Sequence, residues 1–177
     1  MNIKNIILSG FGGQGILFAG KFLAYKGMLE EKEVSWLPSY GPEMRGGTAS
    51  CSVIVSDEKV GSPIITTPNV LIAMNLPSLD KFESTVEKGG IIICDSTLIE
   101  RKVVRDDVTA CYVPATKLAS DNGFPTLANM IIVGKLLNIL GEDSAEDIDA
   151  VLKKIIPAKR AAMAESNLKA LQIGASL

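Results

Sequence analysis

The stretch NIILSGFGGQGILFAGKFLAYKGML, residues 5–29, decides the fold class of this chain. Its first part, Ile6 to Leu8, is a short continuous apolar run, which is typical of a strand buried on both faces of a parallel sheet. A glycine-rich turn follows, and from Gly15 to Leu29 apolar residues cover most of a helical circumference. A strand, a tight turn and a buried helix in this order predict an α/β fold.

The rest of the chain repeats this alternation. We expect strands over 34–37, 70–74, 91–94 and 109–113, and helices over 77–86, 126–140, 144–156 and 158–171. The alternating residues 49–55 predict a strand that turns at 57–59 and returns over 60–65 as a hairpin-like insertion. Ser144 with Asp147 resembles a capping box. The prediction is a three-layer Rossmann-like α/β fold with a mainly parallel sheet, the insertion and a helical C-terminal part, forming one domain over residues 1–177.

Composition excludes several classes of function. A formal net charge of -2 and a pI near 5.3 argue against a nucleic-acid partner. The chain contains no histidine, the commonest general base and nitrogen ligand for metals, so we expect no catalytic residue and no metal site. Cys51, Cys94 and Cys111 form no C-x-x-C pair and are expected to be buried, reduced thiols. No signal peptide or membrane span is evident, which predicts a cytoplasmic protein.

The glycine turn matches the pattern G-x-G-x-x-G between a predicted strand and a predicted helix. Its glycines would let backbone approach a phosphate at the amino terminus of the helix. The candidate cofactor-binding residues are Gly10, Gly12, Gly13, Gln14 and Gly15. The alternative is that the glycines only permit a tight turn and close packing. A dinucleotide is disfavoured, because Leu37-Pro38 stands where an acidic residue for the ribose is normally found.

A second candidate segment is SYGPEMRGG, residues 39–47. It offers an aromatic ring with a polar tip, a guanidinium fork and a backbone able to bind an anion. We expect it to lie beside the glycine turn, since both leave the carboxyl ends of neighbouring strands. The candidate contact residues are Ser39, Tyr40, Gly41, Glu43, Arg45, Gly46 and Gly47. The alternative is a loop with an internal Glu43–Arg45 salt bridge.

Asn75 and Asp95 follow two further predicted strands and could join the same surface. For both residues, capping of the next element is favoured over a ligand role.

Three stretches in order, GFGGQGILFAGKFLA (10–24), WLPSYGPEMRGGTASCSVIVS (36–56) and PNVLIAMNLPSLDKFE (68–83), resemble the gamma subunit of the 2-oxoacid:ferredoxin oxidoreductases. The resemblance is greatest to the 2-oxoglutarate branch, with pyruvate and 2-oxoisovalerate enzymes as alternatives. It implies a subunit without independent activity in a complex that converts a 2-oxoacid and coenzyme A to acyl-CoA and CO2.

The resemblance also implies partners and cofactors. Thiamine diphosphate with Mg and the iron–sulfur clusters would belong to partner subunits, namely alpha, beta and a ferredoxin-like delta chain, and ferredoxin would accept the electrons. Residues 10–15 and 39–47 would contact the partners or coenzyme A near the entrance to the active site. Two hypotheses from other classes are a stand-alone nucleotide-binding oxidoreductase domain and a scaffold that binds no ligand.

Overall fold

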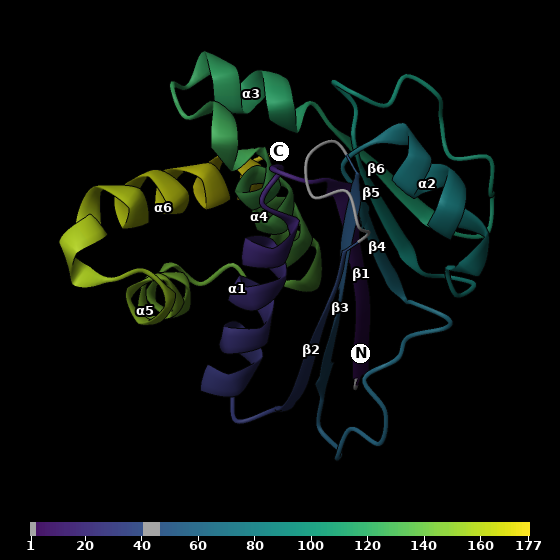
Figure 1. Cartoon of the computed structure of the whole chain (residues 1–177), viewed down its shortest axis with the longest axis horizontal. Helices are drawn as coiled ribbons and strands as arrows, with labels where there is room; N and C mark the ends of the chain where they lie inside the picture. The colour runs from purple at the N-terminus through teal and green to yellow at the C-terminus, as the bar shows by residue number, and fades with distance from the viewer. Residues whose placement is uncertain (1–2, 41–46) are drawn as a thin grey trace.

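One sheet of six strands organises the molecule, in the order β2-β3-β1-β4-β5-β6. The computed structural model describes residues 3–40 and 47–177 (Figure 1). The strands are β1 (Ile3–Phe11), β2 (Glu33–Tyr40), β3 (Thr48–Ser56), β4 (Val70–Ala73), β5 (Ile91–Asp95) and β6 (Thr109–Val113). β1, β4, β5 and β6 are parallel, whereas β3 runs antiparallel to its neighbours β1 and β2. The expected mainly parallel sheet is confirmed.

Helices cover both faces of this sheet, which confirms the three-layer architecture. The helices are α1 (Ile16–Leu29), α2 (Leu76–Phe82), α3 (Ala115–Asp121), α4 (Ala128–Leu140), α5 (Ala145–Ile155) and α6 (Ala161–Ala175). In Figure 1 the helices α1, α4, α5 and α6 lie on one side of the sheet and α2 on the other. α6 packs mainly on α4, and α5 packs on α1 and α6.

The strands β1, β4 and β5 each supply two apolar cores, because side chains alternate across a sheet. Ile6 and Leu8 of β1 join the larger core with Phe22 of α1. The residue between them, Ile7, joins the second core with Leu71 and Leu79 on the α2 side. The uninterrupted apolar run in β1 therefore reflects burial on both faces.

The predicted hairpin-like insertion is wrong in its pairing. β3 forms a hairpin with β2, the strand before it, and its other edge pairs with β1 along its whole length. Both edges of β3 are thus occupied, so the segment 60–65 has no partner strand there. That segment also contains Gly61 and Pro63, which disfavour a strand, and it is irregular.

Three local predictions also need correction. Ser144 precedes α5 as expected, but its side chain makes no capping hydrogen bond, so the capping box does not form. α4 begins at Ala128 after a 3-10 turn, Pro125–Leu127, rather than at 126. The short helix α3 has no counterpart among the predicted elements.

α4 and α6 cross at two glycines. A Cβ added to Gly134 would lie 2.0 Å from the carbonyl oxygen of Leu171, and one added to Gly174 would lie 1.8 Å from that of Ile131. These obstacles are backbone atoms, which cannot rotate away as a side-chain tip can. The two backbones approach so closely only because neither position carries a side chain.

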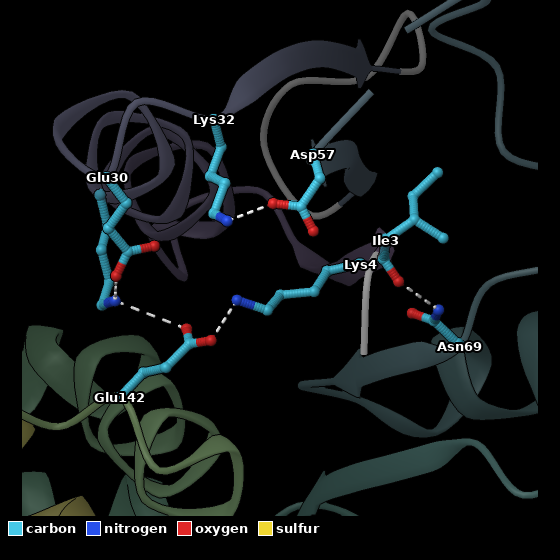
Figure 2. Close-up of polar contacts among 8 residues, drawn as sticks. Ile3, Lys4, Glu30, Lys32, Asp57, Asn69 and Glu142 are labelled. Atoms are coloured by element: carbon cyan, nitrogen blue, oxygen red, sulfur yellow. Dashed lines mark hydrogen bonds and ion pairs between the residues drawn. The ribbon is translucent and has the colours of Figure 1, made fainter. Parts of the chain in front are cut away.

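At the edge of the sheet where β1 begins, ion pairs join distant segments (Figure 2). Lys4 and Lys26 both pair with Glu142, the latter at 3.5 Å, and Lys26 also pairs with Glu30. Asn69 donates from Nδ2 to the carbonyl oxygen of Ile3 at 2.9 Å. These ion pairs connect β1, α1 and the α4–α5 connection. The candidate functional residues lie at the opposite end of the strands.

Candidate functional site

The glycine turn connects β1 to α1 at the carboxyl edge, defined as the edge where β1, β4, β5 and β6 end and β3 begins. Gly13 has φ +96° and Gly15, the N-cap of α1, has φ +72°. Both values lie in the left-handed region that glycine adopts without steric cost. The turn thus needs glycine at these positions for its backbone geometry.

Two of the glycines also lie against neighbouring side chains that leave no space for a Cβ atom. A Cβ on Gly10 would lie 2.8 Å from Cβ of Met74, and one on Gly15 would lie 2.5 Å from Nδ2 of Asn129. The packing alternative therefore explains part of the motif. The ligand alternative also remains, because residues of the same turn line a hollow.

Gln14 braces the turn from within. Its Oε1 accepts a hydrogen bond of 2.6 Å from the Phe11 N–H, and its Nε2 donates one of 3.1 Å to the Met74 carbonyl oxygen. Both ends of the amide are thus engaged by backbone of β1 and the end of β4. Gln14 therefore holds the turn in place.

The start of β3 lies directly beside the glycine turn. The Gly12 N–H donates a hydrogen bond of 2.9 Å to the Gly47 carbonyl oxygen, and Phe11 is paired with Thr48. The expectation that the segments are adjacent holds for these residues, but the reason given for it was wrong. β2 does not neighbour β1, because β3 lies between them.

A hollow of about 300 Å³ lies between the turn, the first turn of α1 and the start of β3. Its walls are apolar side chains and glycine backbone, from Phe11, Gly12, Gly13, Gly15, Ile16, Leu17, Phe18, Gly47, Thr48 and Ala49. α1 has no side-chain cap and no acidic residue in its first turn. Its first N–H groups therefore keep their partial positive charge for an anion, and the apolar wall suits a hydrocarbon part of the same ligand.

The candidate residues of the second segment divide into two groups. Ser39 and Tyr40 end β2, where they pair with Ser50 and Ala49, and Gly47 precedes β3. Gly41, Glu43, Arg45 and Gly46 lie outside the described residues, as does the alternative Glu43–Arg45 salt bridge.

Asn75 caps the next element, α2, as favoured from the sequence, whereas Asp95 binds the turn that follows it and the first turn of α3. Asn75 Oδ1 accepts a hydrogen bond of 2.8 Å from the Ser78 N–H at the start of α2. The Asp95 carboxylate is fully buried and accepts from the Thr97 N–H at 3.1 Å and the Thr116 N–H at 3.2 Å. Their hydrogen bonds stabilise the loops that follow β4, β5 and β6.

Asn129 is a site residue that the sequence did not reveal. It lies in the first turn of α4, is 4% exposed, and donates from Nδ2 to the Gly15 carbonyl oxygen at 2.9 Å. It thereby fixes the N-cap of α1, while its Oδ1 has no hydrogen-bond partner in the described structure. An asparagine inside an apolar helix gives no local signal of a partner so distant in the sequence.

Two of the three thiols, Cys51 and Cys94, are buried. Burial raises the pKa of the Cys51 thiol and of the Cys94 thiol to about 12, which makes both thiols poor nucleophiles near neutral pH. Over residues 3–40 and 47–177 no group of His, Cys, Asp or Glu side chains is arranged to hold a metal ion. In the same part of the chain, no helix is both long and apolar enough to cross a membrane.

The position of β3 weakens the case for a dinucleotide further. In a dinucleotide fold the ribose carboxylate stands at the end of the strand beside β1. Here that place is taken by the start of an antiparallel strand, with Gly47, Thr48 and Ala49. None of the three carries a carboxylate.

Comparison with known proteins supports the assignment of a family. Residues 5–177 match the model of the family described as pyruvate ferredoxin/flavodoxin oxidoreductase. The ketoisovalerate oxidoreductase subunit VorA of Methanothermobacter thermautotrophicus is 42% identical over 95% of this chain, which spans only 35% of that relative. The 2-oxoglutarate synthase subunit KorC of Methanocaldococcus jannaschii is 35% identical over 87% of this chain and 84% of its own length.

A solved structure agrees over nearly the whole chain. The gamma subunit of a keto/oxoacid ferredoxin oxidoreductase from Geobacter sulfurreducens has a TM-score of 0.80 and 28% identity, covering 98% of this chain and 96% of that one. From the family match and these full-length similarities, the chain belongs to the pyruvate ferredoxin/flavodoxin oxidoreductase family.

Proposed function

We propose that this chain is the gamma subunit of a thiamine diphosphate-dependent 2-oxoacid:ferredoxin oxidoreductase, acting as a single domain with no activity of its own. In this proposal the complex oxidises a 2-oxoacid with coenzyme A to acyl-CoA and CO2 and reduces ferredoxin. Thiamine diphosphate with Mg and the iron–sulfur clusters belong to alpha, beta and delta partner chains. The family match and the relatives of similar length support this assignment.

One observation suggests how the subunit takes part. The glycine turn, joined to β3 by the Gly12–Gly47 hydrogen bond, surrounds the hollow at the uncapped start of α1. Coenzyme A carries phosphate groups and a long, largely uncharged arm, which suit the N–H groups of α1 and the apolar wall respectively. We therefore propose that coenzyme A binds at the carboxyl edge, near the entrance to the active site of the complex.

The proposed substrate is 2-oxoglutarate. It is favoured by KorC, a relative that this chain covers over 84% of its length. A branched 2-oxoacid is the second candidate, because VorA is the more similar relative in sequence at 42% identity. A panel of 2-oxoglutarate, 2-oxoisovalerate and pyruvate, assayed with the purified complex and a viologen dye, separates these possibilities by their kcat/KM values.

The first experiment is to purify the tagged chain from its native cells and to assay thiamine diphosphate and iron in what accompanies it. Recovery of a thiamine-containing, iron-containing complex with 2-oxoacid oxidation supports the proposal. Full coenzyme A-dependent activity of the partner chains without this subunit would contradict it. Calorimetric binding of NAD, NADP or FAD to the isolated chain would favour the stand-alone nucleotide-binding alternative instead.

A matched pair of variants tests the coenzyme A surface. Leu17 is half-buried and lies in the first turn of α1 at the hollow. Leu17→Glu and Leu17→Gln lose similar apolar packing, but only the glutamate adds a charge that repels phosphate. We expect the KM for coenzyme A to rise about fivefold more in Leu17→Glu, since one charge at a helix start contributes roughly 1 kcal/mol. Equal KM values in the two variants would place coenzyme A elsewhere.

A further inference from the structure

β2 is one of the two edge strands of the sheet, and its one charged residue is Glu33 at its start. Its principal packing partners among residues 3–40 and 47–177 are β3 and α1, so within that part of the chain no helix packs on the other face or the outer edge of β2. Residues 34–40, VSWLPSY, contain no charged side chain. Exposed edges of soluble proteins usually carry several charges that prevent unwanted pairing, whereas β2 has Glu33 at its start and Pro38 near its end.

Large apolar side chains project from both faces of this edge strand. Trp36 is paired with Val53 and shares the α1 side of the sheet with it, whereas Leu37 is paired with Ser52 on the opposite side. Trp36 is 38% exposed and Leu37 is 39% exposed. Two consecutive residues thus leave apolar surface accessible on opposite faces.

A groove continues this surface onto α1. It has a volume of about 520 Å³ and is lined by Lys21, Ala24, Tyr25, Met28, Val34 and Trp36. Met28 is 58% exposed, and the Lys21 ammonium lies 5.6 Å from the centre of the Tyr25 ring. The ion pairs of the described residues include none to Lys21. The groove is therefore apolar with one cation at its rim.

We infer that the edge-strand surface, formed by Lys21, Tyr25, Met28, Trp36 and Leu37, docks a partner chain of the proposed oxidoreductase. The partner places an apolar side chain in the groove and an acidic side chain opposite Lys21. Apolar, aromatic cores with few charges are typical of stable interfaces between subunits. This inference rests on the proposed function and adds to it the face that the partner covers.

Two observations favour a partner chain over a second copy of this chain. The VorA relative contains a region like this chain within a polypeptide of which the chain spans 35%, so the same fold there adjoins much further protein. A symmetric dimer through β2 would need continuous hydrogen bonding along two edges. Pro38 lacks the N–H group that such pairing requires.

The test uses the complex reconstituted from this chain and its partner chains. Met28→Glu and Leu37→Glu are expected to weaken assembly about 30-fold or more, the usual effect at the centre of an interface. The matched controls Val104→Glu and Met163→Glu change residues that are 82% and 45% exposed on other surfaces. These controls are expected to assemble within about threefold of the wild type. Thermal unfolding of each free variant verifies that it is folded.

Lys21 provides the charge test. Lys21→Glu should weaken assembly more than Lys21→Met, and the difference should shrink at high salt. Affinities of Met28→Glu and Leu37→Glu equal to those of the controls would overturn the inference. A dimer of the free wild-type chain that Met28→Glu dissociates, measured by sedimentation, would overturn it as well and identify a second copy as the occupant. If the wild type binds no thiamine-containing chain at all, the proposed function itself fails.

Discussion

The backbone N–H of Gly12 donates a 2.9 Å hydrogen bond to the carbonyl oxygen of Gly47, which joins the turn after β1 to the residue before β3. Both residues line the hollow, so this bond joins two of its walls. The geometry of the hollow thus depends on two backbone segments that local side-chain changes leave intact.

Substituting Gly15 should cost more stability than substituting Gly13. Both alanine variants must hold a positive φ, at a cost of about 1–3 kcal/mol each. Gly15→Ala also pushes against Asn129, whereas nothing lies within 4 Å of a Cβ on Gly13. We expect Gly15→Ala to be roughly 1–3 kcal/mol less stable than Gly13→Ala in urea unfolding. If the clash is the cause, the difference should shrink in an Asn129→Ala background.

The α4–α6 crossing should tolerate no side chain. Gly134→Ala and Gly174→Ala each place a Cβ against backbone atoms, so the helices must separate. We expect a loss of about 3 kcal/mol or more in the free energy of unfolding for each variant. Gly61→Ala is the control, because nothing lies within 4 Å of its Cβ, and its effect should stay within about 0.5 kcal/mol. A stable Gly134→Ala would show that the crossing can open without cost.

Glu142 should contribute more to stability than a surface carboxylate. It pairs with Lys4 and with Lys26, whose side chain is only 4% exposed. Glu142→Gln leaves these ammonium groups with less compensation, and we expect a loss of about 1–3 kcal/mol. The exposed pair Glu165–Lys169 is the comparison, and Glu165→Gln should change stability much less, because solvent screens this pair. Chemical denaturation of the two variants at neutral pH measures the contrast.

The three thiols should differ in reactivity. Cys51 and Cys94 are buried, and desolvation raises the pKa of each to about 12, whereas Cys111 is only half-buried. A thiol reagent at pH 8 should modify Cys111 first and reach the other two only as the protein unfolds. Mass spectrometry measures the modification rate of each thiol. Equal rates for all three would contradict this ordering.

The raised pKa values of Cys51 and Cys94 predict that the free energy of unfolding falls at alkaline pH. The pKa of both buried thiols lies above the ordinary value of 9.0 that the unfolded chain has. Their contribution is therefore complete below pH 9 and is lost as the pH rises further, because the unfolded chain ionises first. Replacing Cys94 by alanine should reduce the loss of stability between pH 9 and 11, when each protein is compared with itself at pH 7.

The local pattern of the sequence predicted most elements but not their neighbours in space. Apolar runs identified β1, β4, β5 and β6, because strands buried on both faces need such runs. The order β2-β3-β1 was missed, since pairing between strands depends on long-range contacts that periodicity does not encode. α3 was missed because its sequence, ATKLASD, carries one large apolar residue, Leu118, so it shows no helical period.

The site shows the same limit. The glycine pattern indicated the turn and its position correctly, because positive φ values and close packing leave a direct trace in the sequence. Asn129 left no such trace, since its contact with Gly15 joins segments 114 residues apart. The bracing role of Gln14 was likewise hidden, because its partners are main-chain atoms of β1 and of Met74.

The insertion of β3 beside β1 also has a kinetic consequence. β2 and β3 are consecutive in the chain and can pair as a local hairpin. A parallel pair such as β4–β5 can form only after the crossover segment between its two strands has been synthesised. During synthesis the hairpin and α1 are complete before β4 emerges. The antiparallel half of the sheet is therefore available as the template on which the parallel half assembles.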